Sequence, residues 1–267
     1  MDTVLVEKSG PVTTVILNRP EVRNAVDPAT GQKLVDAFLA FEADDDARVA
    51  VFYGDHGVFC AGGDLKALSA SNAKAWAEHL AFRENGNGEL PPGPLGPSRL
   101  LLNKPVIAAV AGPAVAGGME LALWCDMRVM EEDAYFGVYC RRWGVPLIDG
   151  GTVRLPRIVG LGRALDIILT GRKVTAQEAL AIGMCERVAP KGRARKVAEE
   201  IARELCRFPQ ACLRADRLSA YRQDGLTIRE AMRQEYWGGH DCLIDEGVDG
   251  ATRFAAGKGR HGDYTDI

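Results

Sequence analysis

The chain contains two copies of one local pattern, in which an apolar strand leads into a glycine pair and then into a helix. The first copy ends in FCAGGDLK, with Gly62 and Gly63, and the second ends in PAVAGGMELALWCD, with Gly117 and Gly118. Glycine at a strand exit lets the backbone approach a ligand closely, although a tight turn is the simpler explanation of one isolated pair. Because strand and helix patterns alternate through the first 190 residues, the sequence predicts an α/β fold with parallel strands.

The composition argues against several other classes of protein. The 267 residues can bury a full core, as one large domain or two small ones, and the formal net charge of −3 gives no electrostatic reason to expect a nucleic-acid partner. Seven scattered cysteines without a CxxC pair, together with four histidines, favour free thiols in a reducing compartment over a disulfide framework or a metal site.

The N-terminal segment favours a cytoplasmic location. MDTVLVEKSGPVTTVILNRP is typical of paired strands and has the pattern of neither a signal peptide nor a transit segment. No apolar run approaches the roughly 18 residues that span a bilayer, so we expect no membrane partner.

Local patterns give the elements around the glycine turns. Residues 12–17, 48–53 and 104–112 are typical of strands, and Asp27 is predicted to cap a helix that begins at Pro28. From Lys191 onward the pattern is helical. Breaks are expected there at Pro209, Gly225 and Gly238–Gly239.

Two segments lie between the glycine turns. Residues 66–83 are predicted to be helical, and residues 84–98 are rich in Gly and Pro and are expected to form an irregular loop. A loop of that length inside a compact domain is usually mobile and functional.

The second glycine pair lies at the start of a predicted helix, where the first N–H groups have no internal acceptor and carry the positive end of the helix dipole. An oxygen that gains negative charge is stabilised there, as in an oxyanion hole. Amides from two separate glycine turns are able to hold one such oxygen, and a thioester carbonyl that becomes an enolate is an example.

Glu120 follows Gly117 by three residues, which brings its carboxylate toward these amides. It is either a catalytic group or a helix N-terminal carboxylate favoured by the dipole. Other motifs are missing: the chain has no Lys-Ser/Thr phosphate loop, no GxGxxG dinucleotide fingerprint and no GxSxG nucleophile elbow.

Together the motifs resemble the crotonase superfamily of enoyl-CoA hydratases and isomerases. The resemblance covers roughly residues 10 to 190 and rests on five segments in this order: NRPEVRNAVD, FCAGGDLK, KPVIAAVAGPAVAGGMELALWCD, the FG pair near 136, and LTGRKVTAQEALAIGMCERV. Each segment alone is a weak signal, but the ordered set is specific.

The resemblance implies a crotonase-like spiral of ββα units with a C-terminal helical trimerisation region. Residues 1–195 would form the spiral core, and residues 196–267 would mediate homotrimers, often paired into hexamers. It also implies acyl-coenzyme A substrates, with the coenzyme A thioester as substrate and no separate cofactor.

The family's site residues carry over onto this sequence position by position. The two amides that hold the thioester oxygen are those of Gly63 and Gly117. The residues expected to border coenzyme A are Arg23, Ala25, Ala61, Asp64, Leu65 and Lys66, with Arg23 and Lys66 near the phosphates. Phe254 and Lys258 lie where relatives contact a neighbouring subunit's adenine.

One departure from the family concerns the catalytic carboxylates. Glu120 matches one of the two hydratase glutamates, but Cys140 occupies the place of the second, and a thiol with a pKa near 8.5 is a poor substitute at neutral pH. Asp149 is the nearest replacement, and it is also a candidate N-cap of the following helix. Cys140 is expected to be a packing residue, and Trp143 a core or pocket-wall residue.

The sequence therefore predicts an acyl-CoA enzyme that stabilises an enolate, with hydration of trans-2-enoyl-CoA as the leading reaction. The first alternative is double-bond isomerisation or another reaction that needs a single carboxylate, which Cys140 favours. The second is an acyl-CoA-binding protein without catalytic activity.

Overall fold

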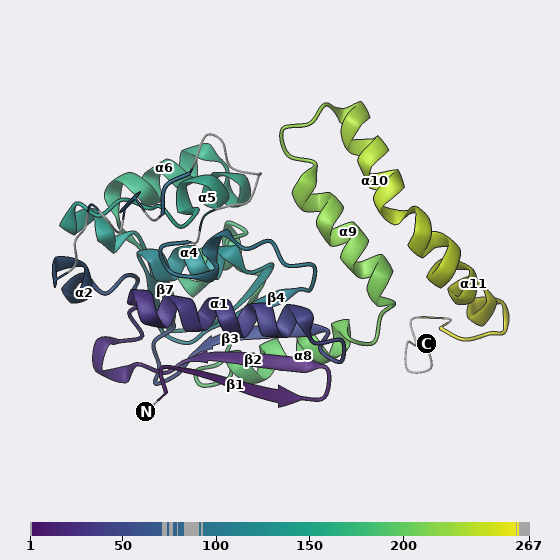
Figure 1. The fold of residues 1–267 in the computed structure, drawn as a ribbon, viewed down its shortest axis with the longest axis horizontal. Helices are drawn as coiled ribbons and strands as arrows, with labels where there is room; N and C mark the ends of the chain where they lie inside the picture. Colours follow the sequence, from purple (N-terminus) through teal and green to yellow (C-terminus); the bar gives the residue numbers. More distant parts are fainter. Residues whose placement is uncertain are drawn as a thin grey trace.

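The computed structural model describes residues 2–70, 74, 77–78, 80–82, 91, 93–259 and 261, and its strands form two sheets (Figure 1). The larger sheet has the order β1-β2-β3-β4-β6-β9, and the smaller has the order β5-β7-β8. The strands are β1 (Val4–Ser9), β2 (Val12–Leu17), β3 (Val49–Gly54), β4 (Val106–Val110), β5 (Pro113–Val115), β6 (Met127–Glu131), β7 (Tyr135–Gly137), β8 (Lys173–Thr175) and β9 (Arg187–Ala189).

The larger sheet confirms the predicted parallel pairing. Only β1 and β2 run antiparallel, as a hairpin at one edge, and each later neighbour in this sheet pairs in parallel. The predicted C-terminal boundary of the single strand over 104–112 is wrong. Gly112 has φ +64 and turns the chain there, so that Pro113–Val115 enters the smaller sheet as β5.

Helices cover both faces of the larger sheet. On one face, α1 (Pro28–Ala43) buries Phe38 against Phe52 of β3, and its predicted N-cap is confirmed because the Asp27 side chain accepts a hydrogen bond from Thr30 N. The other face is covered by α8 (Ala194–Leu205). Successive strand residues point to opposite faces, which explains why Val49 and Val51 pack on α8 while Phe52 faces α1.

The remaining helices of the α/β core are α2 (Leu65–Ala70), α4 (Gly117–Trp124), α5 (Gly151–Val159), α6 (Leu161–Thr170) and α7 (Ala176–Ala181). All residues of α4 are buried. Short 3-10 turns occupy Pro20–Val22, Pro97–Arg99 and Tyr139–Trp143. The predicted helix over 66–83 is described as α2 at its start, and most of the rest lies outside the described residues.

The C-terminal helices form a hairpin beside this core, and α9 is bonded to it through Arg217 and Tyr221 (Figure 1). They are α9 (Gln210–Arg222), α10 (Ile228–Cys242) and α11 (Val248–Ala255), with a π-helical segment at Leu243–Gly247, and none of their residues is buried. The predicted boundary at 195 falls inside α8, which packs on the sheet. No described helix is long and apolar enough to cross a membrane.

The break expected at Gly238–Gly239 is wrong, because α10 continues through both residues. A glycine inside a helix costs only about 1 kcal/mol relative to alanine. Around the pair, Tyr236, Trp237 and His240 contact one another ring to ring, with centroids 5.1 to 5.8 Å apart. These side-chain contacts offset the weak helix preference of the two glycines.

Candidate active site

A cavity of about 430 Å³ lies beside both glycine turns and the start of α5. The residues predicted to hold the thioester oxygen, to act as carboxylates and to border coenzyme A within the first 150 positions all line it. These are Arg23, Ala25, Ala61, Gly63, Asp64, Leu65, Lys66, Gly117, Glu120 and Asp149. The sequence motifs are therefore gathered at one place, although they are distributed over more than 120 positions of the chain.

The two glycine turns touch each other. Cys60 forms a parallel bridge with Ala114, the residue that leads into the second turn. A Cβ atom added to Gly62 would lie only 3.0 Å from Gly117 N and 2.9 Å from Ala116 Cβ. Gly62 also has φ +94, so only glycine fits this position without strain.

The Gly63 amide points away from its neighbouring strand. Gly62 O accepts from Val26 N and Asp64 N donates to Val26 O, so the residue between them turns its own N–H toward the opposite edge. Among the described residues, Gly63 N has no hydrogen-bond acceptor.

The Gly117 amide is the first N–H of α4 and likewise has no acceptor in the described part of the chain. Ala116 precedes it with φ 53 and ψ −126, a conformation that costs an L-residue about 1–3 kcal/mol and is typical of functional sites. The Ala116 N–H donates to Gly137 O at 2.8 Å, which anchors this turn on β7. Two free amides therefore lie at the contact between the glycine turns.

The Glu120 carboxylate accepts hydrogen bonds at the N-terminus of α5, and not at the N-terminus of its own helix, α4, as predicted. Oε1 accepts hydrogen bonds from Asp149 N at 3.0 Å and from Gly151 N at 2.7 Å, so it caps α5 rather than its own helix. The second oxygen, Oε2, has no hydrogen-bond partner among the described residues, and it is not among the fully buried polar atoms that lack a partner, so part of its surface is accessible. Since Glu120 lines the cavity, this second oxygen is open to it.

Asp149 is buried, and its carboxylate does not cap α5. Oδ1 accepts from Leu95 N at 3.0 Å and from Ser98 Oγ, both in the segment before β4. The N-cap of α5 is Gly150, with φ 96 and no side-chain cap, so the N-cap interpretation of Asp149 is wrong.

Burial changes the acidity of both carboxyl groups. It raises the pKa of Glu120 to about 8, with a further increase from the Asp149 charge and an opposing effect of the amides of Gly151 and Asp149. Burial also raises the pKa of Asp149, while the hydrogen bonds from Ser98 and Leu95 oppose the rise. Strongly perturbed carboxyl groups in a cavity are typical of catalytic sites.

Arg154 links these elements. Its guanidinium donates from Nη1 to Asp149 O at 2.9 Å and from Nη2 to Ser98 O at 2.7 Å. The helix α5 is thereby tied to the loop that holds Asp149. Neither Ser98 nor Arg154 was predicted from the sequence, because no local motif identifies them. Ser98 lies more than 50 positions from Asp149 and from Arg154, and Arg154 contacts the backbone of Asp149 from a full helix turn away.

Cys140 packs in the core and lines the cavity, and burial raises the pKa of its thiol. Trp143 is part of the cavity wall and is 71% exposed, so of the two roles predicted for it the core role is wrong. The guanidinium of Arg142 stacks on Tyr139, with Cζ 4.1 Å from the ring centroid. The position of the second family glutamate is therefore occupied by an un-ionised thiol.

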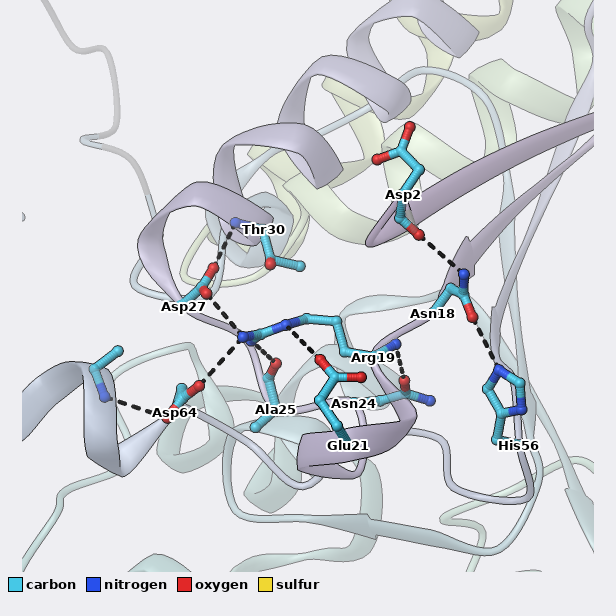
Figure 2. Close-up of polar contacts among 11 residues, drawn as sticks. Asp2, Asn18, Arg19, Glu21, Asn24, Ala25, Asp27, Thr30, His56 and Asp64 are labelled. Atoms are coloured by element: carbon cyan, nitrogen blue, oxygen red, sulfur yellow. Dashed lines mark hydrogen bonds and ion pairs between the residues drawn. The ribbon is translucent and has the colours of Figure 1, made fainter.

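A partly buried arginine, Arg19, connects the predicted coenzyme A segments (Figure 2). Arg19 contacts Asp27 Oδ2 at 2.9 Å and Asp64 Oδ2 at 3.4 Å through Nη2, and it donates from Nη1 to Ala25 O. Asp64 Oδ1 in turn accepts from the N–H groups of Lys66 and Ala67 at the start of α2. The sequence analysis included Arg19 only within a motif and did not predict this role.

Two further predicted segments are only partly described. Of the loop predicted over 84–98, residues 84–90 and 92 lie outside the described residues, while Pro94 and Leu95 line the cavity. Phe254 and Lys258 are exposed on and after α11 and do not line this cavity, so their contact with a neighbouring subunit stays a prediction.

Comparisons with known proteins assign the chain to a family. A family model described as enoyl-CoA hydratase/isomerase matches residues 7–235. Enoyl-CoA hydratase EchA19 of Mycobacterium tuberculosis is 38% identical over 205 residues, which cover 74% of this chain and 72% of that protein. The carnitinyl-CoA dehydratase of Salmonella typhimurium is 34% identical over 206 residues, or 74% and 72% of the two chains.

Solved structures agree with this. The crystal structure of enoyl-CoA hydratase EchA1 from Mycobacterium marinum matches with a TM-score of 0.85 at 30% identity, covering 95% of this chain and 96% of that one. The chain belongs to the enoyl-CoA hydratase/isomerase family, and it is an enzyme with acyl-CoA chemistry. The predicted superfamily and fold are confirmed.

Proposed function

We propose that this enzyme hydrates trans-2-enoyl-CoA to 3-hydroxyacyl-CoA. The observation that carries the proposal is the pair of amides of Gly63 and Gly117, which have no acceptor among the described residues and line the same cavity as a carboxyl group whose pKa is raised to about 8. Both N–H groups donate to the thioester oxygen and stabilise the enolate that forms when water adds to carbon 3.

The two carboxyl groups differ in a way that supports separate roles. Burial and, to a smaller extent, the Asp149 charge raise the pKa of Glu120 to about 8, so Glu120 holds a proton near neutral pH. In our proposal Asp149 is the ionised base that takes a proton from water, and Glu120 is the acid that delivers a proton to carbon 2. The hydroxyl adds to carbon 3, and the proton passed to Asp149 returns to solvent or to Glu120.

Double-bond isomerisation is the second candidate, because Cys140 leaves the usual second glutamate position without a carboxylate. A single acid–base group is able to move a proton between carbons 4 and 2 of the acyl chain. If the Asp149→Asn variant keeps its turnover rate, isomerisation is favoured. If the rate of enoyl-CoA turnover falls by about 10²-fold or more, hydration is supported.

The test uses short, medium and long trans-2-enoyl-CoAs and follows loss of the conjugated thioester absorbance. Hydration predicts turnover for at least one chain length, and absence of turnover with all of them rejects it. A parallel incubation with a 3-enoyl-CoA detects isomerisation as new conjugation. Binding of acyl-CoA without solvent-deuterium exchange at carbon 2 would instead indicate a non-catalytic binder.

A trimer or hexamer built through the C-terminal helices is also part of this proposal, as is a cytoplasmic location in fatty-acid metabolism. The support for assembly is the apolar surface of α10 and α11, where Ile228, Trp237 and Val248 are each at least 60% exposed. Sedimentation of the purified protein tests it, and a monomer at micromolar concentration contradicts it.

A further inference from the structure

Two thiols on the C-terminal helices face each other. Cys212 is in the first turn of α9 and is exposed, and Cys242 is the last residue of α10 and is partly exposed. The other five cysteines are buried in the α/β core and α8: Cys60, Cys125, Cys140, Cys185 and Cys206. The accessible thiols of the chain are therefore confined to one helical hairpin.

A bidentate contact fixes the two helices at this point. The carboxylate of Glu246 accepts hydrogen bonds from Ala211 N at 3.1 Å and from Cys212 N at 2.8 Å. Glu246 lies four residues after Cys242, about one helical turn further along the same side. The start of α9 is thus held against the end of α10, next to the Cys242 side chain.

The thiols are in direct contact across this junction. Burial raises the pKa of Cys212, and the Asp216 charge and a side-chain hydrogen bond with Cys242 add to the rise. The Cys242 thiol also lies 3.1 Å from Gly239 O, which orients Sγ along α10. The Glu246 contacts and the hydrogen bond between the two thiols together place Cys212 beside Cys242.

We propose that Cys212 and Cys242 are a disulfide site that links α9 to α10 when the protein meets a thiol oxidant. With diamide as the oxidant, the Cys212 thiolate adds to the N=N bond. The Cys242 thiolate then attacks the Cys212 sulfur, the S–S bond forms and the S–N bond breaks. Two protons and two electrons pass to the diamide, which leaves as a hydrazine.

The link would fix the outer part of the C-terminal region to the core. Contacts of α9 with the core include Arg217 Nε and Tyr221 Oη, which donate to Asp126 Oδ1 at 2.8 and 2.7 Å. No residue of α10 or α11 is buried, so these helices depend on α9 for their position. A disulfide that closes the hairpin limits the freedom of its separated state.

Neither cysteine lines the catalytic cavity, so this inference is independent of the proposed reaction. The experiment treats the folded protein with diamide, blocks remaining thiols and maps tryptic peptides without reduction. Peptide 208–214 contains Cys212 alone, and peptide 234–253 contains Cys242 alone. The expected product is these two peptides joined, and in a denaturing gel without reductant the chain keeps the mobility of a monomer.

Single variants provide the controls. Cys212→Ser and Cys242→Ser should each lose the joined peptides, whereas Cys206→Ala, at a buried cysteine before α9, should retain them. Full alkylation of both thiols after diamide treatment would overturn the proposal. So would a link found only in disulfide-joined dimers of the chain.

Discussion

The helices α4 and α5 both begin at a glycine and lack a side-chain cap from the preceding residue. They differ in whether the first N–H group of the helix has a hydrogen-bond acceptor. At α5 the Gly151 N–H donates to Glu120 Oε1 at 2.7 Å. At α4 the Gly117 N–H has no acceptor in the described part of the chain. The protein thus fills one helix N-terminus with its own carboxylate and keeps the other open beside the cavity. The open one is the helix end available to a substrate oxygen.

The largest effect is expected when Glu120, the carboxylate at the N-terminus of α5, is replaced. Glu120→Gln keeps a side-chain oxygen that can accept from Gly151 N but removes the proton donor. We expect kcat/KM for the enoyl-CoA substrate to fall by about 10²–10⁴-fold with the far-ultraviolet circular dichroism unchanged. Wild-type rates in this variant would show that Glu120 is only a structural cap of α5.

The open helix end is tested by comparing Gly117→Pro with Gly117→Ala. Both substitutions add a Cβ near Leu95 Cδ1, a flexible side-chain atom, but only proline removes the N–H, and proline is well tolerated at the first helical position. The proline variant should be slower than the alanine variant by about 10²–10³-fold. Equal rates in the two variants would contradict a role of this amide.

The contact between the glycine turns is tested by comparing the stability of two variants, Gly62→Ala and Gly63→Ala, which each add one methyl group at neighbouring positions. Gly62→Ala places a Cβ 2.9 Å from Ala116 Cβ at φ +94, and we expect a loss of about 1–3 kcal/mol in the free energy of unfolding. Gly63→Ala meets Leu95 Cδ2 at 3.7 Å, an ordinary contact, and keeps its N–H, so stability should change by less than about 0.5 kcal/mol. Chemical denaturation of the two variants measures the difference.

The last prediction concerns the pH dependence of stability. A carboxyl group whose pKa is raised from 4.5 in the unfolded chain to about 8 in the folded chain favours folding at low pH, and this contribution falls as pH rises between those values. The free energy of unfolding should therefore decrease from pH 5 to 7, by at most about 1.4 kcal/mol per unit from this group. Glu120→Gln should flatten that slope, leaving the part due to Asp149, whose pKa is shifted in the same direction.

The sequence predicts the positions of the reactive groups better than their partners. Local patterns identify the strands, the Asp27 cap and the two glycine turns because each depends on neighbouring residues. The N–H groups that donate to Glu120 lie some 30 positions away along the chain, and the donors to Asp149 lie more than 50 positions away, so neither set could be read from spacing. The expected cap at Asp149 was wrong because Gly150 takes that position.

The C-terminal region shows the same limit. The helices and the breaks at Pro209 and Gly225 follow from local residues, but the break at Gly238–Gly239 was wrong because aromatic contacts along α10 compensate for the glycines. The Arg19 contacts with Asp27 and Asp64 join three separate segments. Such contacts appear only when the chain is folded.

The corner at Gly112, where the chain passes from the large sheet to the small one, bears on how the enzyme is made. A Cβ at this position would lie 2.0 Å from Gly57 O, so the second strand–turn–helix unit closes directly over the loop of the first. The two glycine turns pack against each other, so the cavity that both of them line is complete only after the two units have docked. Newly synthesised chains should therefore remain inactive until both units have docked, and recovery of turnover during refolding reports completion of the core rather than formation of its helices.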